Sequence, residues 1–278
     1  MNYIKLKRNK IDFCNICGKK EKLTWDHVPP KIAGNNTTIN VNEFFSGVPT
    51  TEHYQKRYQS GIKYRTICGT CNNTVLGKYD RAYGKFVKEL SNIIESKIIL
   101  PSKIRIPVEI NKVCRAICGH FLAAKDFYDD ANIVDIELRK FVLDPSYIMV
   151  KNIKIYYWVY PYTTISIIRD VAVNNMFSNN LLPKNMVSGI SSYPIALLLD
   201  SDSDSQCGLD NLMDYVTEKI DDIVEIEIDL EKSYYPGTEL VRHYLWPFNI
   251  TDDQNGASFV LGNGDTMHGS RLGIKINR

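Results

Sequence analysis

The chain has 278 residues, which is long enough for one large domain or two smaller ones. Its 44% hydrophobic and 24% charged residues are ordinary for a soluble globular protein. Residues 1–13 are basic but lack the apolar core of a signal peptide, and later apolar stretches are too short to span a bilayer. These features exclude membrane and secretory classes at the sequence level, so we expect a cytoplasmic protein with no membrane partner.

The net charge of +2 hides an uneven distribution. Residues 1–90 contain 16 Lys and Arg against 7 Asp and Glu, a difference of +9, and the rest contain 18 against 25, a difference of −7. A basic N-terminal segment suits a polyanion such as nucleic acid, because neutralised phosphates release their counterions. A solvated lysine-rich surface gives the same count, so charge alone leaves both interpretations open.

The first predicted elements are a cysteine-containing turn and a strand. Cys14 and Cys17 delimit the turn, and residues 23–28 have the pattern of a strand that Pro29 and Pro30 end, since proline supplies no ladder donor. Residues 31–61 are rich in Asn, Thr and Gly, which predicts a long loop or insertion. Loops of that length are uncommon unless they are functional.

A helix is predicted directly after the second cysteine pair, Cys68 and Cys71. One apolar face results from residues at three- and four-residue steps: Leu76, Tyr79, Tyr83, Phe86, Leu90 and Ile94. The helix is expected to end near Lys97, before a proline-bounded stretch. We therefore predict two domains, residues 1–97 and residues 98–278.

The second domain is predicted to combine helices with antiparallel strands. A second amphipathic helix is expected from about Lys112 to Phe127. Beyond Tyr147, β-branched and aromatic residues predict strands at 154–160, 164–168, 194–199 and 223–230. The expected class is α+β. Its expected role is target recognition, dimerisation or docking to a protein partner.

Four of the seven cysteines form two Cys-x-x-Cys pairs, Cys14/Cys17 and Cys68/Cys71. In a reducing cytosol such pairs are metal ligands more often than disulfides. Four thiolates satisfy a tetrahedral structural zinc ion. The pairs are separated by roughly 50 residues, more than is usual in zinc ribbons. Because both pairs lie beside Gly or Asn turn residues, we predict one Zn²⁺ held by all four thiolates.

Asp26 and His27 end the predicted strand, and Asn72 directly follows the second cysteine pair. A carboxylate, an imidazole and an amide gathered by a zinc scaffold could bind a divalent cation and activate a water molecule. An imidazole has a pKa near 6.5 and accepts a proton at neutral pH. These three residues are therefore predicted to be catalytic, although a lone histidine at a strand end is more often structural.

The pattern Cys14-x-x-Cys17, Asp26-His27-Val-Pro-Pro30 and Cys68-x-x-Cys71-Asn72 before a helix resembles the zinc-stapled HNH endonucleases. The resemblance covers about the first third of the chain. It implies a treble-clef-like ββα-metal module with one catalytic Mg²⁺ or Mn²⁺ ion. It implies that His27 is the general base and that Asp26 and Asn72 bind this ion.

The resemblance also implies hydrolysis of phosphodiester bonds in DNA. By analogy with other chains that join such a module to an unrelated domain, the expected setting is phage defence or restriction. RNA is an alternative substrate, because a one-metal site does not choose its sugar. The alternative function is a non-catalytic zinc module that binds nucleic acid or a protein partner.

One position departs from the family pattern. The family places an asparagine a few residues before the second cysteine pair, where this chain has Lys63. An asparagine from the long segment could substitute, or Lys63 could contact phosphate and act in the site itself. The asparagines in that segment are Asn35, Asn36, Asn40 and Asn42.

Other polar residues are weaker candidates. Asp80 could join the site but is more often a surface carboxylate, and His53 beside Glu52 is a weaker candidate still. Expected phosphate contacts are Arg65, Lys78, Arg81 and Lys85. Two cysteines and a histidine share the second helix, and buried cysteines are expected there rather than a second metal site: Cys114, Cys118 and His120. Two segments are expected to be solvated turns, 200–204 and 262–266.

Overall fold

The computed structural model describes residues 8–36, 39–45, 55–160, 164–173, 185–201, 209–230 and 258–264. Within these ranges the chain forms three α-helices and three antiparallel sheets, which confirms the expected mixture of helix and sheet. The helices are α1 (Gly77–Ile94), α2 (Ile110–Ala123) and α3 (Ile133–Leu143). Shorter helical turns are η1 (Lys31–Ala33), the π-helix η2 (Cys71–Leu76) and η3 (Leu212–Tyr215).

A small sheet carries the residues of the predicted site. Its strand order is β1-β2-β5, with bounds Ile11–Phe13, Lys20–His27 and Lys63–Cys68. Strand β2 runs antiparallel to β5, so that Asp26 lies opposite Tyr64 and His27 opposite Lys63. A register shift between Thr24 and Asp26 interrupts this pairing. The ends of β2 and β5 that carry His27 and Lys63 are thereby placed together.

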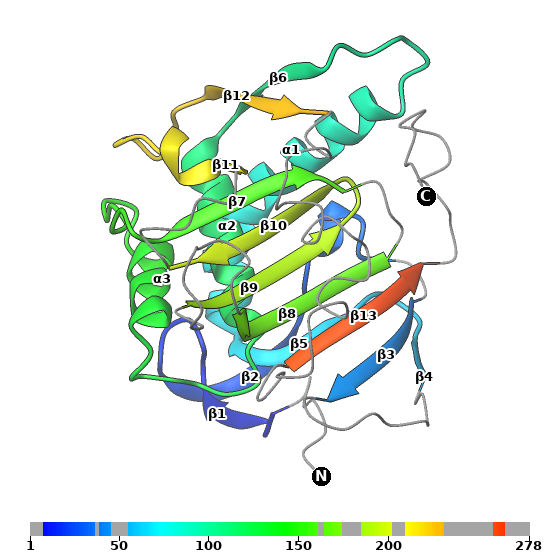
Figure 1. The fold of residues 1–278 in the computed structure, drawn as a ribbon. Helices are drawn as coiled ribbons and strands as arrows, with labels where there is room; N and C mark the ends of the chain where they lie inside the picture. Colours follow the sequence, from blue (N-terminus) through cyan, green and yellow to red (C-terminus); the bar gives the residue numbers. More distant parts are fainter. Residues whose placement is uncertain are drawn as a thin grey trace.

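The largest sheet has the strand order β11-β7-β10-β9-β8-β13-β3-β4 (Figure 1). In that order its bounds are Asp210–Asn211, Lys154–Val159, Ile195–Asp200, Asn185–Ser192, Thr164–Val173, Ser258–Gly264, Ile39–Phe45 and Gln55–Tyr58. A third sheet pairs β6 (Lys103–Val108) with β12 (Val224–Asp229). The four strands expected in the second domain thus become β7, β8, β10 and β12.

The segment 31–61 was predicted to be a loop, and the structure corrects this. It contains β3 and β4, which form one edge of the large sheet (Figure 1). Strand β4 pairs with β3, and β3 pairs with β13 near the end of the chain. Asparagine is depleted in strands and hides the alternation of Ile39 to Phe45. The partner strand holds Gly262 and Gly264 opposite Val41 and Ile39, so this part of 262–266 is a strand and not the expected turn.

Helices α1 and α2 pack together behind the large sheet (Figure 1). Helix α1 buries the apolar face expected from its spacing, from Tyr79 through Ile94. One continuous apolar core joins α1 to α2 and to the strands, and it extends on both sides of residue 97. The division of the chain into domains at that residue stays a prediction.

The end of α2 is set by side chains from the small sheet. The helix was predicted to reach Phe127 but ends at Ala123. The Asn15 amide nitrogen donates to the carbonyl oxygens of Leu122 and Lys125, at 3.0 and 2.7 Å, and the Thr66 hydroxyl donates to that of Ala123 at 2.6 Å. These bonds satisfy carbonyl groups that a helix end leaves unpaired, and they dock the cysteine turn against α2.

Helix α3 was not expected from the sequence. Its first turn is capped by Asn132, whose side chain accepts a hydrogen bond from the Asp135 backbone N–H. The helix buries Asp135, Glu137 and Arg139 beside its apolar residues. Buried charges at these positions remove the apolar stripe by which an amphipathic helix is recognised in a sequence.

Asp135 is the centre of a buried group of charges that joins α3 to α2 and β8. Its carboxylate lies 2.7 Å from Lys125 Nζ and 3.0 Å from Arg169 Nη2, and the residue is 1% exposed. Lys125 also lies 3.0 Å from Asp170. Removing one member of such a group leaves the opposite charges buried and uncompensated.

We therefore expect Asp135→Ala to lower the free energy of unfolding by about 3–5 kcal/mol. The matched control is Asp221→Ala, because Asp221 pairs with Lys112 at 2.7 Å but its side chain is 79% exposed. An exposed pair contributes at most about 1 kcal/mol. Urea unfolding of both variants measures the difference, and equal losses would show that the buried group does not hold the fold together.

Candidate functional site

Four cysteine thiols gather where the turn after β1 meets the end of β5. The sulfur atoms of Cys14, Cys17, Cys68 and Cys71 all lie within 4.8 Å of one another. The turn is closed by a hydrogen bond from the Gly18 N–H to the Cys14 carbonyl, 2.9 Å long, and the Cys68 N–H donates to Cys14 Sγ at 3.3 Å. The predicted clustering of the two cysteine pairs is confirmed.

The spacing of the sulfurs fits a tetrahedral ion. Four thiolates about 2.3 Å from zinc lie about 3.8 Å apart, and the Cys17 and Cys68 sulfurs are 3.8 Å apart. That distance is far beyond the length of a disulfide, and all four thiols are free. The four cysteines could therefore hold a zinc ion, with no coordination position left for a substrate.

The thiols also differ in pKa, because a thiolate at one cysteine makes ionisation of its neighbours less favourable. A hydrogen bond from Cys71 lowers the pKa of Cys14 to about 5. Burial and the neighbouring thiols raise the pKa of Cys68 to about 12, and the bond to Cys14 followed by burial raises that of Cys71. Only a cation bound among them would allow all four to be thiolates at neutral pH.

His27 is held by the backbone at the end of β2. Its Nε2 lies 2.9 Å from the Ser60 carbonyl oxygen, so Nε2 carries the proton and donates it. Nδ1 is then the unprotonated nitrogen that can accept a proton. Burial lowers the pKa of His27 despite the bond to Ser60, which favours the neutral ring at neutral pH. This is the protonation state that a general base requires.

Asn72 is held against β2 by its amide nitrogen. That nitrogen donates to Thr24 Oγ1 at 3.1 Å and to the Trp25 carbonyl oxygen at 2.9 Å. Asn72 therefore lies beside the residue that precedes Asp26, and its amide oxygen remains available as an acceptor. Asp26 itself is 6% exposed.

Asn35 connects the chain just after His27 with the turn before β5 that carries Ser60. It is fully buried, its amide nitrogen donates to the Pro29 and Ile62 carbonyls at 2.8 and 2.9 Å, and its amide oxygen accepts from the Ile62 N–H at 2.8 Å. Lys63 instead donates to Ser60 Oγ at 2.5 Å. Asn36 is exposed, and the side chains of Asn40 and Asn42 lie outside the described residues. Of the open alternatives, Asn35 makes the bonds that fix the loop.

The position of His120 in this region was not predicted from the sequence, which considered it only for a second metal site. It comes from α2, is fully buried, and lies between two carboxylates, with Nε2 2.9 Å from Asp80 Oδ1 and Nδ1 3.5 Å from Asp26 Oδ2. Burial opposes its charge, but Asp80 and Asp26 outweigh burial and raise the pKa of His120 to about 10. Its six-residue offset from Cys114 gave no signal, because its partners belong to β2 and α1.

The remaining candidates make other contacts. Arg65 donates to the Arg8 carbonyl and lies 5.6 Å from the Trp25 ring centre, and Lys78 lies 4.8 Å from the Tyr79 ring centre. Arg81 is exposed. The two cysteines of α2 are fully buried, as expected, and burial raises the pKa of both: Cys114 and Cys118.

Two further expectations concern the segments set aside as weak candidates. Asp200 ends β10 and is fully buried, so the solvated turn expected from this residue onward is wrong at its first position. Asp202 and Asp204 lie outside the described residues, as do Glu52 and His53. In the described part of the chain, the four-cysteine group is the one cluster of metal-binding type that is found.

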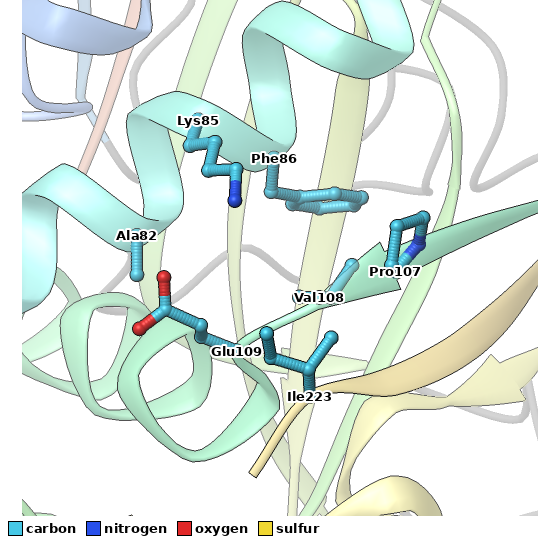
Figure 2. A pocket seen from close by; sticks show the side chains of 7 residues that line it. All are labelled: Ala82, Lys85, Phe86, Pro107, Val108, Glu109 and Ile223. Atoms are coloured by element: carbon cyan, nitrogen blue, oxygen red, sulfur yellow. The ribbon is translucent and has the colours of Figure 1, made fainter. Parts of the chain in front are cut away.

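A cavity of about 140 Å³ lies between α1 and the strand pair β6/β12 (Figure 2). Its walls are mainly apolar, with one amine and one carboxylate at the rim. The lining residues are Ala82, Lys85, Phe86, Pro107, Val108, Glu109 and Ile223. None of the predicted catalytic or metal-binding residues lines it. Lys85, expected as a phosphate contact, therefore lies at this cavity and not beside His27 or the four cysteines.

Comparisons with known proteins identify no relative for this chain. No protein-family model, curated protein or solved structure matches it. In the described residues, no helix is both long and apolar enough to cross a membrane. The function is therefore inferred from the positions of the residues themselves.

The zinc assignment predicts a metal content of one zinc ion per chain. We expect Cys17→Ala to lose this ion and to lower the melting temperature, because three thiolates leave the site open to water. Cys114→Ala is the matched control, since Cys114 is buried in α2 outside the cluster. Elemental analysis of the purified proteins measures the ion, and full zinc in Cys17→Ala would contradict the assignment.

Two glycines with positive φ, Gly61 and Gly34, should differ in how much stability is lost when each is replaced by alanine. Gly61 has φ +79° and a Cβ there would lie 2.3 Å from the Asn35 oxygens, whereas Gly34 has φ +96° and no atom within 4 Å. Gly34→Ala should cost about 1 kcal/mol through backbone strain alone. Gly61→Ala should cost about 3 kcal/mol because it also displaces Asn35. Equal values in urea unfolding would mean that Asn35 does not hold the loop that carries Ser60.

Proposed function

We propose that the chain is a metal-dependent endonuclease that hydrolyses phosphodiester bonds in DNA. The observation that carries the proposal is the environment of His27. Its ring is fixed through Nε2, which leaves Nδ1 to accept a proton. A histidine fixed in one tautomer and close to the Asp26 carboxylate fits water activation better than a structural role.

The order of the elements supports the same proposal. Strand β2 pairs with β5, and η2 and α1 follow, so two antiparallel strands lead into a helix as the resemblance implies. The four cysteines join the turn before β2 to the end of β5. The sequence left the middle position of the family pattern open between Lys63 and an asparagine of the long segment. We propose Asn35 for it, because its side chain makes hydrogen bonds to Pro29 and Ile62.

The donor atoms near His27 fit a hard divalent cation. Asp26 offers a carboxylate and Asn72 an amide oxygen, which are ligands that Mg²⁺ and Mn²⁺ accept. Asp26 Oδ2 is buried and lies 3.5 Å from His120 Nδ1, so Oδ1 is the carboxylate oxygen that we assign to the ion. When bound there, such an ion supplies Lewis-acid stabilisation of negative charge on a phosphate.

The chain's own residues perform the other tasks. His27 Nδ1 takes the proton from the attacking water, while the Ser60 carbonyl keeps the ring oriented and keeps the Nε2 proton in place. Asn35 and Gly61 fix the loop that carries Ser60. Each contact restricts the general base to one orientation, which is how a site lowers the entropic part of a barrier.

The face of β2 and β5 beside His27 is suited to a nucleic acid. Side chains alternate along a strand, and Lys63 and Arg65 are partly exposed on β5 whereas Tyr64 and Thr66 are buried. Trp25 is 48% exposed on β2 and lies under the Arg65 guanidinium. These two cationic side chains can contact phosphates, and the indole can stack on a nucleobase, close to His27.

One observation favours the alternative, a non-catalytic zinc module that binds nucleic acid or protein. Asp26 is nearly buried and its Oδ2 faces His120, which is an arrangement that a purely structural ion pair would also have. The face formed by Trp25, Lys63 and Arg65 would serve such a module equally. Loss of cleavage in a variant that still binds DNA separates the two functions.

We expect the purified chain to nick plasmid DNA with Mg²⁺ or Mn²⁺, and His27→Ala to lower the rate about 100- to 10,000-fold, because general-base catalysis is lost. Asn73→Ala is a control variant that should keep the wild-type rate, since Asn73 is exposed and is not one of the proposed site residues although it is adjacent to Asn72. Zinc content and DNA affinity of His27→Ala should equal those of the wild type.

Two results would contradict the nuclease. One is cleavage by His27→Ala at the wild-type rate, which would point to a contaminating enzyme or a different base. The other is a wild-type chain that binds DNA but fails to cleave it whichever divalent ion is added, which is the result expected of the non-catalytic module. A matched RNA substrate in the same assay tests the choice of sugar.

A further inference from the structure

A buried histidine from outside the small sheet reaches the predicted ion site. His120 lies on α2, Asp26 on β2 and Asp80 on α1, so three separate elements meet at one imidazole. Its Nε2 is 2.9 Å from Asp80 Oδ1 and its Nδ1 is 3.5 Å from Asp26 Oδ2. Neither Asp26 Oδ2 nor His120 Nδ1 has a hydrogen bond to another described residue.

The chemistry of these atoms makes the contact favourable only in one form. A carboxylate accepts hydrogen bonds and donates none, so both ring nitrogens must carry protons to face two carboxylates. The positive ring, whose side chain is 2% exposed, then offsets the two negative charges. The side chain of Asp80 is 20% exposed and that of Asp26 is 7% exposed, so the solvent screens the Asp80 end more than the Asp26 end.

Asp26 thereby has two unlike oxygens. Oδ2 faces His120, and Oδ1 is the oxygen left to bind an ion through one atom. Mg²⁺ commonly keeps several waters and takes one or two carboxylates in this way. A carboxylate held by a neighbouring donor is also preorganised, because its rotation about χ2 is restricted before the ion arrives.

We propose that His120, itself anchored by Asp80, is a positioning residue that fixes the Asp26 carboxylate for the catalytic divalent ion. This inference rests on the proposed function. It gives α2 a part in the site, although α2 lies beyond the N-terminal residues that carry the family resemblance. The contact also explains why a histidine is buried in a helix whose other buried residues are largely apolar.

Two substitutions test the two ring nitrogens of His120 separately. His120→Asn keeps an amide N–H near the position of Nδ1 and so retains a donor toward Asp26. His120→Gln keeps one near the position of Nε2 and so retains a donor toward Asp80. A residue needed only for packing or charge balance should respond to both changes alike, whereas a positioning residue should tolerate Asn better than Gln.

The experiment measures Mn²⁺ binding directly, by electron paramagnetic resonance of free Mn²⁺, beside the Mn²⁺ concentration that gives half-maximal plasmid nicking. We expect His120→Gln to weaken Mn²⁺ binding about 10- to 100-fold, as loss of a supporting contact does. His120→Asn should weaken it less. Zinc content and melting temperature check that each variant is folded.

Asp80→Asn provides a second test if the His120 variants do not fold, because the Asp80 side chain is partly exposed and touches the ring at its far end. It should weaken Mn²⁺ binding in the same direction by loosening His120. Mn²⁺ binding unchanged in His120→Gln and Asp80→Asn, with Asp26→Asn losing it, overturns the inference and leaves the nuclease intact. A wild-type chain that neither binds Mn²⁺ nor cleaves DNA overturns the proposed function itself.

Discussion

The structure around the candidate site depends on the approach of four sulfur atoms from two parts of the chain. Cys14 and Cys17 precede β2, and Cys68 and Cys71 end β5 and begin η2. A structural zinc ion in such a cluster contributes about 10 kcal/mol or more, comparable with the whole stability of a domain. This one contact therefore fixes the start of β2 relative to the end of β5, and with it the register that places His27 opposite Lys63.

The cysteine turn does not stand apart from the rest of the chain. Asn15, between its two ligands, binds the carbonyl groups at the end of α2, and its own carbonyl accepts a hydrogen bond from Arg139 Nε of α3 at 2.9 Å. The same α2 carries His120 to Asp26. The candidate site is thus supported by helices that follow residue 97. A small shift of α2 would change the distance between His120 and the Asp26 carboxylate.

Local patterns in the sequence were sufficient for the features with short spacing. The two Cys-x-x-Cys turns, the apolar stripe of α1 and the β-rich strands β7 and β12 follow from composition and periodicity. Helix α3 was missed because its buried charges interrupt that periodicity. Strand β3 was missed because it is rich in asparagine and is completed by pairing with β13, more than 200 residues later.

The site divides in the same way. Asp26, His27 and Asn72 could be nominated because each lies at a recognisable place beside a cysteine pair or a strand end. Asn35 could be named only as one of several asparagines, since its role depends on hydrogen bonds to Pro29 and to Ile62, the latter 27 residues away in the chain. His120 was considered only for a second metal site with Cys114 and Cys118, because its contacts with the two carboxylates exist only in the folded chain. The residues proposed to perform chemistry lie at places with local sequence signals, whereas those proposed to orient them are defined by tertiary contacts alone.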